Sequence, residues 1–111
     1  MDFHSDKPIY LQIADAFCEG VLSGELEAGG RVPSVREYGA DIGVNPNTVM
    51  RVYEKLTADG ILFNKRGIGY FVAEDAREKI LEVQRKEFLQ KDVPAIKRKM
   101  QLLGLDAKIF A

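Results

Sequence analysis

The order of short segments between residues 32 and 72 constrains the fold more than any other feature of this chain. Ser34 and Glu37 have the S-x-x-E spacing of a capping box, in which each side chain binds a backbone N–H of the other's turn, so a helix is predicted to begin at Ser34. This helix is expected to end near Ile42, because Gly43 readily adopts the left-handed conformation that follows a helix C-terminus. These signals predict a short helix followed by a tight turn.

A second helix and a hairpin are predicted after this turn. Asn45 is a favourable N-cap and Pro46 a favourable first helical residue, so two independent signals mark the start of the second helix. Residues 61–65 and 70–72 have the composition of two strands, and the two glycines between them supply the positive φ angles that a hairpin tip needs. Arg31-Val32 is expected to form a further short strand.

Helical periodicity is also present on both sides of this region. An N-terminal helix is predicted from Pro8 to about Ser23, with apolar residues repeating at four-residue spacing along one face. After residue 73 the apolar spacing again becomes helical and predicts two C-terminal helices. The second of these is predicted to begin at Asp92, as its N-cap, and to end at Gly104.

Together these elements predict a mainly α protein with a small β-hairpin wing, which is an α+β fold class. We expect a winged helix-turn-helix domain over residues 1–73, followed by two C-terminal helices over residues 74–111. A length of 111 residues, with 46% hydrophobic and 30% charged residues, suits one ordinary folded domain or a small domain with an appendage.

This composition leaves little room for catalytic or metal-binding chemistry. Cys18 is the only cysteine and His4 the only histidine, which excludes an internal disulfide and a structural zinc site. The sequence contains neither a convincing Ser/His/Asp set nor a G-x-x-x-x-G-K-[ST] phosphate loop, so we expect no enzyme activity and no cofactor. A signal-peptide pattern and a membrane-spanning apolar run are also missing, so we expect a cytoplasmic protein without a membrane partner.

The distribution of charge is more informative than the net charge of −1. Residues 1–73 hold seven Lys or Arg against ten Asp or Glu, a net charge of −3, whereas residues 74–111 hold nine against seven. This acidity favours an alternative function, a winged helix that binds another protein and has no specific affinity for DNA. The cations of the first region nevertheless gather in or beside the predicted helix-turn-helix and hairpin, which favours contact with DNA phosphates.

The polar residues of this region suit contact with double-stranded DNA. A recognition helix presents short polar side chains and a cation to the major groove from its first two turns. The N-terminus of the preceding helix can bind a phosphate, and a basic hairpin can lie along the backbone or in the minor groove. The alternative is ordinary surface polarity beside helix caps and a tight hairpin. The predicted DNA-binding residues are Ser34, Arg36, Asn47, Thr48, Arg51, Lys65, Arg66 and Gly67.

The two C-terminal helices carry more apolar surface than the small first domain can cover. They either fold back onto the N-terminal helix or pair with a second copy of the chain, and we favour self-association. A dimer doubles the cations that meet phosphates and steepens the slope of log K against log salt from roughly −3 to roughly −7. Dimers also match palindromic operators. The predicted dimerisation residues are Ile80, Val83, Phe88, Ile96, Met100 and Leu103.

The helix-turn-helix and hairpin segments between residues 32 and 72 resemble the GntR family of bacterial transcription regulators. The resemblance includes Gly29-Gly30-Arg31-Val32-Pro33 before the first of these helices and Gly69-Tyr70-Phe71-Val72 at the end of the hairpin. The resemblance covers about residues 5–73 and implies a winged helix that binds operator DNA as a homodimer. The short tail is similar to the YtrA-type subgroup, whose two C-terminal helices mainly dimerise and whose members often regulate transporter operons. With the polar start of the second helix and the basic wing, we expect a repressor. Because the tail is short, we do not expect a dedicated pocket for a small-molecule effector. Gly39 departs from the alanine usual in the family, which costs helix stability of up to about 1 kcal/mol but lets the next helix pack closer.

Overall fold

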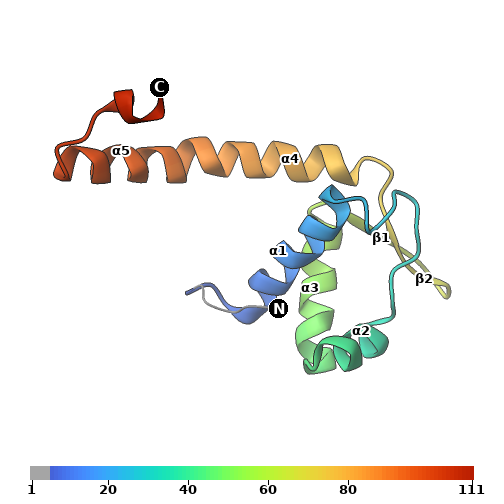
Figure 1. Ribbon diagram of the computed structural model, residues 1–111. Helices are drawn as coiled ribbons and strands as arrows, with labels where there is room; N and C mark the ends of the chain where they lie inside the picture. The colour runs from blue at the N-terminus through green and yellow to red at the C-terminus, as the bar shows by residue number, and fades with distance from the viewer. Residues whose placement is uncertain (1–5) are drawn as a thin grey trace. The chain divides into compact units, whose positions relative to one another are not determined.

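The computed structural model describes residues 6–111 and divides into two compact units, with the division between Ile80 and Leu81. His4 lies outside the described residues. The described part is mainly helical and contains one two-stranded antiparallel sheet, which confirms the predicted α+β class. The elements, in chain order (Figure 1), are α1 (Ile9–Leu22), α2 (Val35–Ile42), α3 (Pro46–Ala58), β1 (Leu62–Lys65), β2 (Gly69–Val72), α4 (Ala76–Glu87), the π-helical η1 (Phe88–Asp92), α5 (Val93–Leu102) and the 3-10 helix η2 (Ala107–Phe110).

The core of the first unit lies where α1, α2, α3 and the hairpin meet. In Figure 1, α1 runs beside α3, and α2 lies across the N-terminal end of α3. Phe17 of α1 contacts Tyr38 of α2 and Tyr53 of α3, with ring centroids 6.3 and 6.2 Å apart. The buried residues of this core are Ile13, Ala14, Phe17, Cys18, Val21, Val32, Val49, Val52, Tyr53, Leu56, Ile61, Leu62, Val72, Ala76 and Ile80.

The turn between α2 and α3 has the predicted form. Gly43 follows α2 with a φ of 70°, and Asn45 caps α3. A Cβ atom on Gly39 would lie only 2.7 Å from the carbonyl oxygen of Val44, a separation that real Cβ atoms essentially never show. Glycine at this position therefore allows the turn, and with it the start of α3, to pass close to α2.

The hairpin has the predicted antiparallel pairing. Its register runs from Leu62 opposite Val72 to Lys65 opposite Gly69, which leaves residues 66–68 at the tip. The short strand that we predicted before α2 is reduced to an isolated bridge between Arg31 and β2. The bridge still anchors the segment before α2 to the side of the wing.

Two predicted helix starts are wrong in detail. Pro8 is the N-cap of α1 and not its first residue, because its ψ of 147° is extended. Asp92 has helical φ and ψ and makes no side-chain cap, so helical backbone continues from α4 through η1 into α5. Pro94 lacks an N–H and its ring crowds the preceding turn of a regular α-helix. The wider π-helical turn just before it, in which the Val93 N–H donates to the Phe88 carbonyl, accommodates the proline.

The second unit ends in a C-terminal hook, which we define as residues 104–111. Gly104, with a φ of 68°, follows α5 and reverses the chain. The Leu105 N–H then donates to the Met100 carbonyl, and Asp106 caps the short helix η2. Within residues 6–111, no helix is both long enough and apolar enough to cross a membrane.

Candidate nucleic-acid interface

The first turns of α3 present polar side chains on the surface of the first unit. The Asn45 side-chain oxygen accepts a hydrogen bond from the Asn47 N–H at 2.8 Å, which fixes the start of the helix. The opposite face of α3 is buried, so Asn47 and Arg51 are exposed and Thr48 is half-buried. Side chains of this kind on an accessible helix end can reach the edges of bases in a major groove.

The N-terminus of α2 carries the predicted capping box. The Ser34 hydroxyl accepts from the Glu37 N–H at 3.1 Å, and the Glu37 carboxylate accepts from the Ser34 N–H at 3.3 Å. A serine hydroxyl that accepts one bond still has its own hydrogen to donate, so the cap is compatible with a bound phosphate. Arg36 is exposed one residue into the helix. The Tyr53 hydroxyl of α3 donates to the Pro33 carbonyl at 2.7 Å and so fixes the segment that leads into α2.

The wing carries its two cations at the end of β1 and at the tip. Lys65, Arg66 and Gly67 are all exposed, and Gly67 has a φ of 79°. The Lys65 ammonium lies 4.7 Å from the centroid of the Phe71 ring, so the lysine leans back over the wing. Arg66 is consequently the cation carried by the turn itself.

Arg31 is a wing residue that our sequence analysis missed as part of the site. Its guanidinium donates to the Ile68 carbonyl at 3.0 Å and lies so close to Gly69 that a Cβ atom there would be 3.3 Å from the guanidinium Nε. Arg31 therefore braces the wing tip. The sequence signals at Arg31 are the short strand expected around it and its place in the family motif, and neither reveals the partner 37 positions away.

Tyr10 lies in the first turn of α1 and also contacts α3. Its half-buried ring packs against the core, and the Arg51 guanidinium carbon lies 3.9 Å from the ring centroid. The structure therefore brings the start of α1 next to the polar turns of α3. This pair joins residues that are far apart in the sequence, so local pattern alone does not reveal it.

The second unit has an exposed apolar face on α5 and the hook. A hollow of about 420 Å³ in this unit is lined mainly by apolar side chains. Among the predicted dimerisation residues, Val83, Phe88, Ile96 and Leu103 are exposed and Met100 is half-buried. The prediction that Ile80 belongs to the dimerisation surface is wrong, because its side chain is 1% exposed and lies in the core of the first unit. The hollow is lined by Phe88, Val93, Ile96, Lys97, Met100, Gln101, Leu105, Asp106, Ala107 and Phe110.

Comparison with known proteins identifies the family. Residues 9–72 match the family described as "Bacterial regulatory proteins, gntR family". The chain belongs to the GntR family. Members of the GntR family are transcription regulators that bind DNA, and the relatives of this chain are regulators rather than enzymes.

Individual GntR proteins resemble the chain over most of its length. The uncharacterized HTH-type transcriptional regulator YhcF of Bacillus subtilis is 39% identical over 93% of this chain and 84% of its own length. The HTH-type transcriptional repressor YtrA of the same organism is 39% identical over 74% of this chain and 63% of its own length. The crystal structure of a putative GntR-family regulator from Bacteroides thetaiotaomicron is 45% identical, with a TM-score of 0.79 over 93% of this chain and 89% of the other. These likenesses confirm the winged-helix fold and the predicted resemblance to YtrA.

Proposed function

We propose that this GntR-family protein is a homodimeric repressor that binds a palindromic operator through residues 1–73 and pairs through residues 74–111. The observation that carries the proposal is the accessible polar start of α3, where Asn47 and Arg51 are exposed. The repressor role is supported by the name of the related YtrA. Because the YtrA-type subgroup often regulates transporter operons, we extend the proposal to an operon of that kind.

The proposed contacts divide into base reading and phosphate binding. Asn47, Thr48 and Arg51 read base edges in the major groove, because short polar groups and a guanidinium fork match the hydrogen-bonding pattern there. Ser34, Arg36, Lys65, Arg66 and Gly67 contact the sugar-phosphate backbone from the start of α2 and from the wing, and so set the register of α3 without reading sequence.

Dimerisation is supported by the apolar face of the second unit. Phe88 and Ile96 are 50% and 44% exposed, and with Met100 they line the same hollow. Apolar side chains gathered in this way mark an interaction surface more often than an ordinary monomer surface. A second copy is the occupant that this proposal assigns to the face, because a DNA-binding domain with a net charge of −3 needs the phosphate contacts of two subunits to bind tightly.

The DNA-binding part is tested by selection of binding sites from a random duplex library, followed by affinity measurements over a range of salt concentrations. Arg51→Ala should weaken binding to the selected duplex by about 1–3 kcal/mol. Arg98→Ala removes the same charge from exposed α5 and should change binding little. If no sequence is selected, or if binding is insensitive to salt, the protein does not read DNA with α3. Capture of a protein that survives nuclease treatment would then favour the interaction-module alternative.

The dimer is tested by sedimentation of charge variants on α5. Ile96→Asp places a carboxylate on the apolar face and should yield monomers, with the salt slope falling from roughly −7 toward roughly −3. Arg98→Asp is the matched control, because Arg98 lies about 200° around the helix from Ile96. A wild-type chain that sediments as a monomer at micromolar concentration, or an Ile96→Asp variant that remains dimeric, would contradict this part of the proposal.

A further inference from the structure

The start of α1 and the first turns of α3 enclose a shallow hollow of about 350 Å³ on the first unit. The three side chains that we propose to read bases all line it. The remainder of its lining comes from the N-cap residue and the first two residues of α1. The lining residues are Pro8, Ile9, Tyr10, Asn47, Thr48 and Arg51.

The contact that organises this hollow is a stack between Arg51 and Tyr10. The guanidinium carbon of Arg51 lies 3.9 Å from the centroid of the Tyr10 ring, well within the range of a cation–π interaction. Stacking uses the face of the guanidinium, whereas its five N–H donors lie in its plane. Within residues 6–111, no carboxylate forms an ion pair with Arg51. The stacked side chain thus retains donors for a guanine edge or a phosphate.

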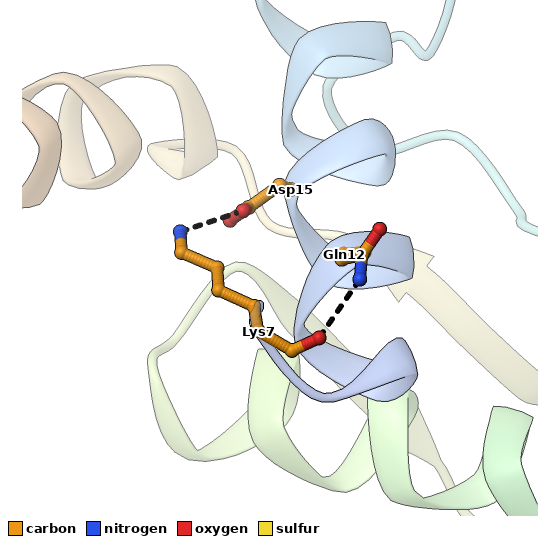
Figure 2. Close-up of polar contacts among 3 residues, drawn as sticks. All are labelled: Lys7, Gln12 and Asp15. Atoms are coloured by element: carbon orange, nitrogen blue, oxygen red, sulfur yellow. Dashed lines mark hydrogen bonds and ion pairs between the residues drawn. The ribbon is translucent and has the colours of Figure 1, made fainter. Parts of the chain in front are cut away.

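The backbone that carries Tyr10 is held in place by contacts at the start of α1. The Gln12 side-chain amide donates to the Lys7 carbonyl at 2.8 Å, and the Lys7 ammonium lies 3.0 Å from an Asp15 carboxylate oxygen (Figure 2). The carbonyl of Pro8 also accepts from two N–H groups of the first helical turn. These contacts fix the segment on both sides of the residues that approach α3, so the ring offers a defined surface to Arg51.

We infer that Tyr10 is a positioning residue for DNA recognition, which holds the Arg51 guanidinium in one orientation before DNA arrives. The inference rests on the proposed function. A free arginine has one of the largest side-chain entropies, and a side chain that is already ordered loses less of it on binding. Because non-specific binding depends mainly on charge, which Tyr10 does not carry, the stack increases affinity for the correct site more than affinity for other DNA.

The test compares Tyr10→Leu and Tyr10→Phe on two duplexes, one selected from a random library by the wild-type protein and one scrambled version of it. Tyr10→Leu removes the ring and should weaken binding to the selected duplex by about two- to fivefold, with little change on the scrambled duplex. Tyr10→Phe retains a ring and should bind the selected duplex as tightly as the wild-type protein does. Equal weakening on both duplexes, or no weakening by Tyr10→Leu, would overturn the inference.

A double-mutant cycle separates this inference from the proposed function. In an Arg51→Ala background, Tyr10→Leu should have no further effect on specific binding, because the side chain that it positions is gone. An effect of the same size in both backgrounds would show that Tyr10 acts independently of Arg51 and would refute the inference alone. If Arg51→Ala does not weaken binding at all, the assignment of α3 as the reading helix fails instead.

A measurement on the wild-type protein covers the case in which Tyr10→Leu does not fold. The stack places the Arg51 side-chain protons over an aromatic ring, so their NMR resonances should be shifted upfield by its ring current in the free protein. Tyr10→Phe should preserve the shift. Resonances at random-coil positions in the wild type would refute the stack regardless of the behaviour of any variant.

Discussion

Removal of one oxygen atom from the core should measurably destabilise the first unit. The ring of Tyr53 is 0% exposed, and its hydroxyl donates to the Pro33 carbonyl at 2.7 Å. Tyr53→Phe preserves the ring and its packing but leaves that carbonyl without its donor, which costs about 1–3 kcal/mol when the carbonyl is buried. Pro33 is half-buried, so water replaces part of the lost bond and we expect about 1–2 kcal/mol. The melting temperature should fall by roughly 5–10 °C.

Urea unfolding followed by circular dichroism at neutral pH measures this loss, and Tyr38→Phe is the matched control. The Tyr38 ring lies 6.1 Å from that of Tyr53, but within residues 6–111 its hydroxyl donates to no protein group. Its loss should therefore cost less than about 0.5 kcal/mol. If both variants lose the same free energy of unfolding, or if Tyr53→Phe is as stable as the wild type, the hydrogen bond to Pro33 does not stabilise the fold.

Three further predictions concern the cap, the wing brace and alkaline pH. Ser34→Ala removes the acceptor of the α2 capping box and should lower the free energy of unfolding by about 1 kcal/mol in urea titrations, whereas Ser34→Thr should retain it. Arg31→Lys keeps the charge but loses the planar fork that reaches the Ile68 carbonyl, so affinity for the selected duplex should fall by about two- to tenfold with an unchanged salt slope. Burial raises the pKa of the Cys18 thiol to about 11 from its ordinary value of 9.0. Because the unfolded thiol ionises first, the free energy of unfolding should fall as pH rises from about 9 to about 11, by at most about 1.4 kcal/mol per pH unit. Cys18→Ala should flatten this part of the curve, and an unchanged slope would show that the thiol does not contribute.

The parts of the fold that sequence revealed depend on contacts between residues close in the chain. The capping box joins Ser34 to Glu37, and the Asn45 cap reaches only two residues ahead. Gly43 takes its left-handed φ because of the turn in which it lies. Both partners of each of these contacts lie within a few residues of one another. Residue types alone therefore locate α2, α3 and the turn between them.

The misplaced helix start has a physical explanation of the same kind. Asp92 followed shortly by Pro94 resembles the cap and proline that begin α3, but the two sites differ in what precedes them. Gly43 ends α2 before the cap of α3, whereas no glycine precedes Asp92 within η1. Without a residue suited to a left-handed conformation, the helical backbone continues and the proline is accommodated by a wider turn.

The residues that sequence analysis misjudged depend on long-range packing. Apolar spacing placed Ile80 on a helix face but did not reveal which neighbour covers that face, and in the structure it belongs to the first unit's core. Arg31 and Tyr10 make their contacts with Ile68 and Arg51, which lie far away in sequence. Their places in the candidate site follow from the tertiary fold and from no local pattern.

The π-helical turn η1 determines whether Phe88, at its own start, shares a direction with the side chains of α5. A regular α-helix rotates by about 100° per residue, so eight uninterrupted residues would place Ile96 about 80° away from Phe88, and twelve would place Met100 about 120° away. One extra residue within the turn reduces each angle to about 20° and aligns all three in a single stripe. The alignment of this stripe, which is part of the proposed dimer surface, therefore depends on how many residues the turn contains. Deletion of one residue from Leu89–Asp92 would turn Phe88 away from Ile96 and Met100 although all three side chains remain.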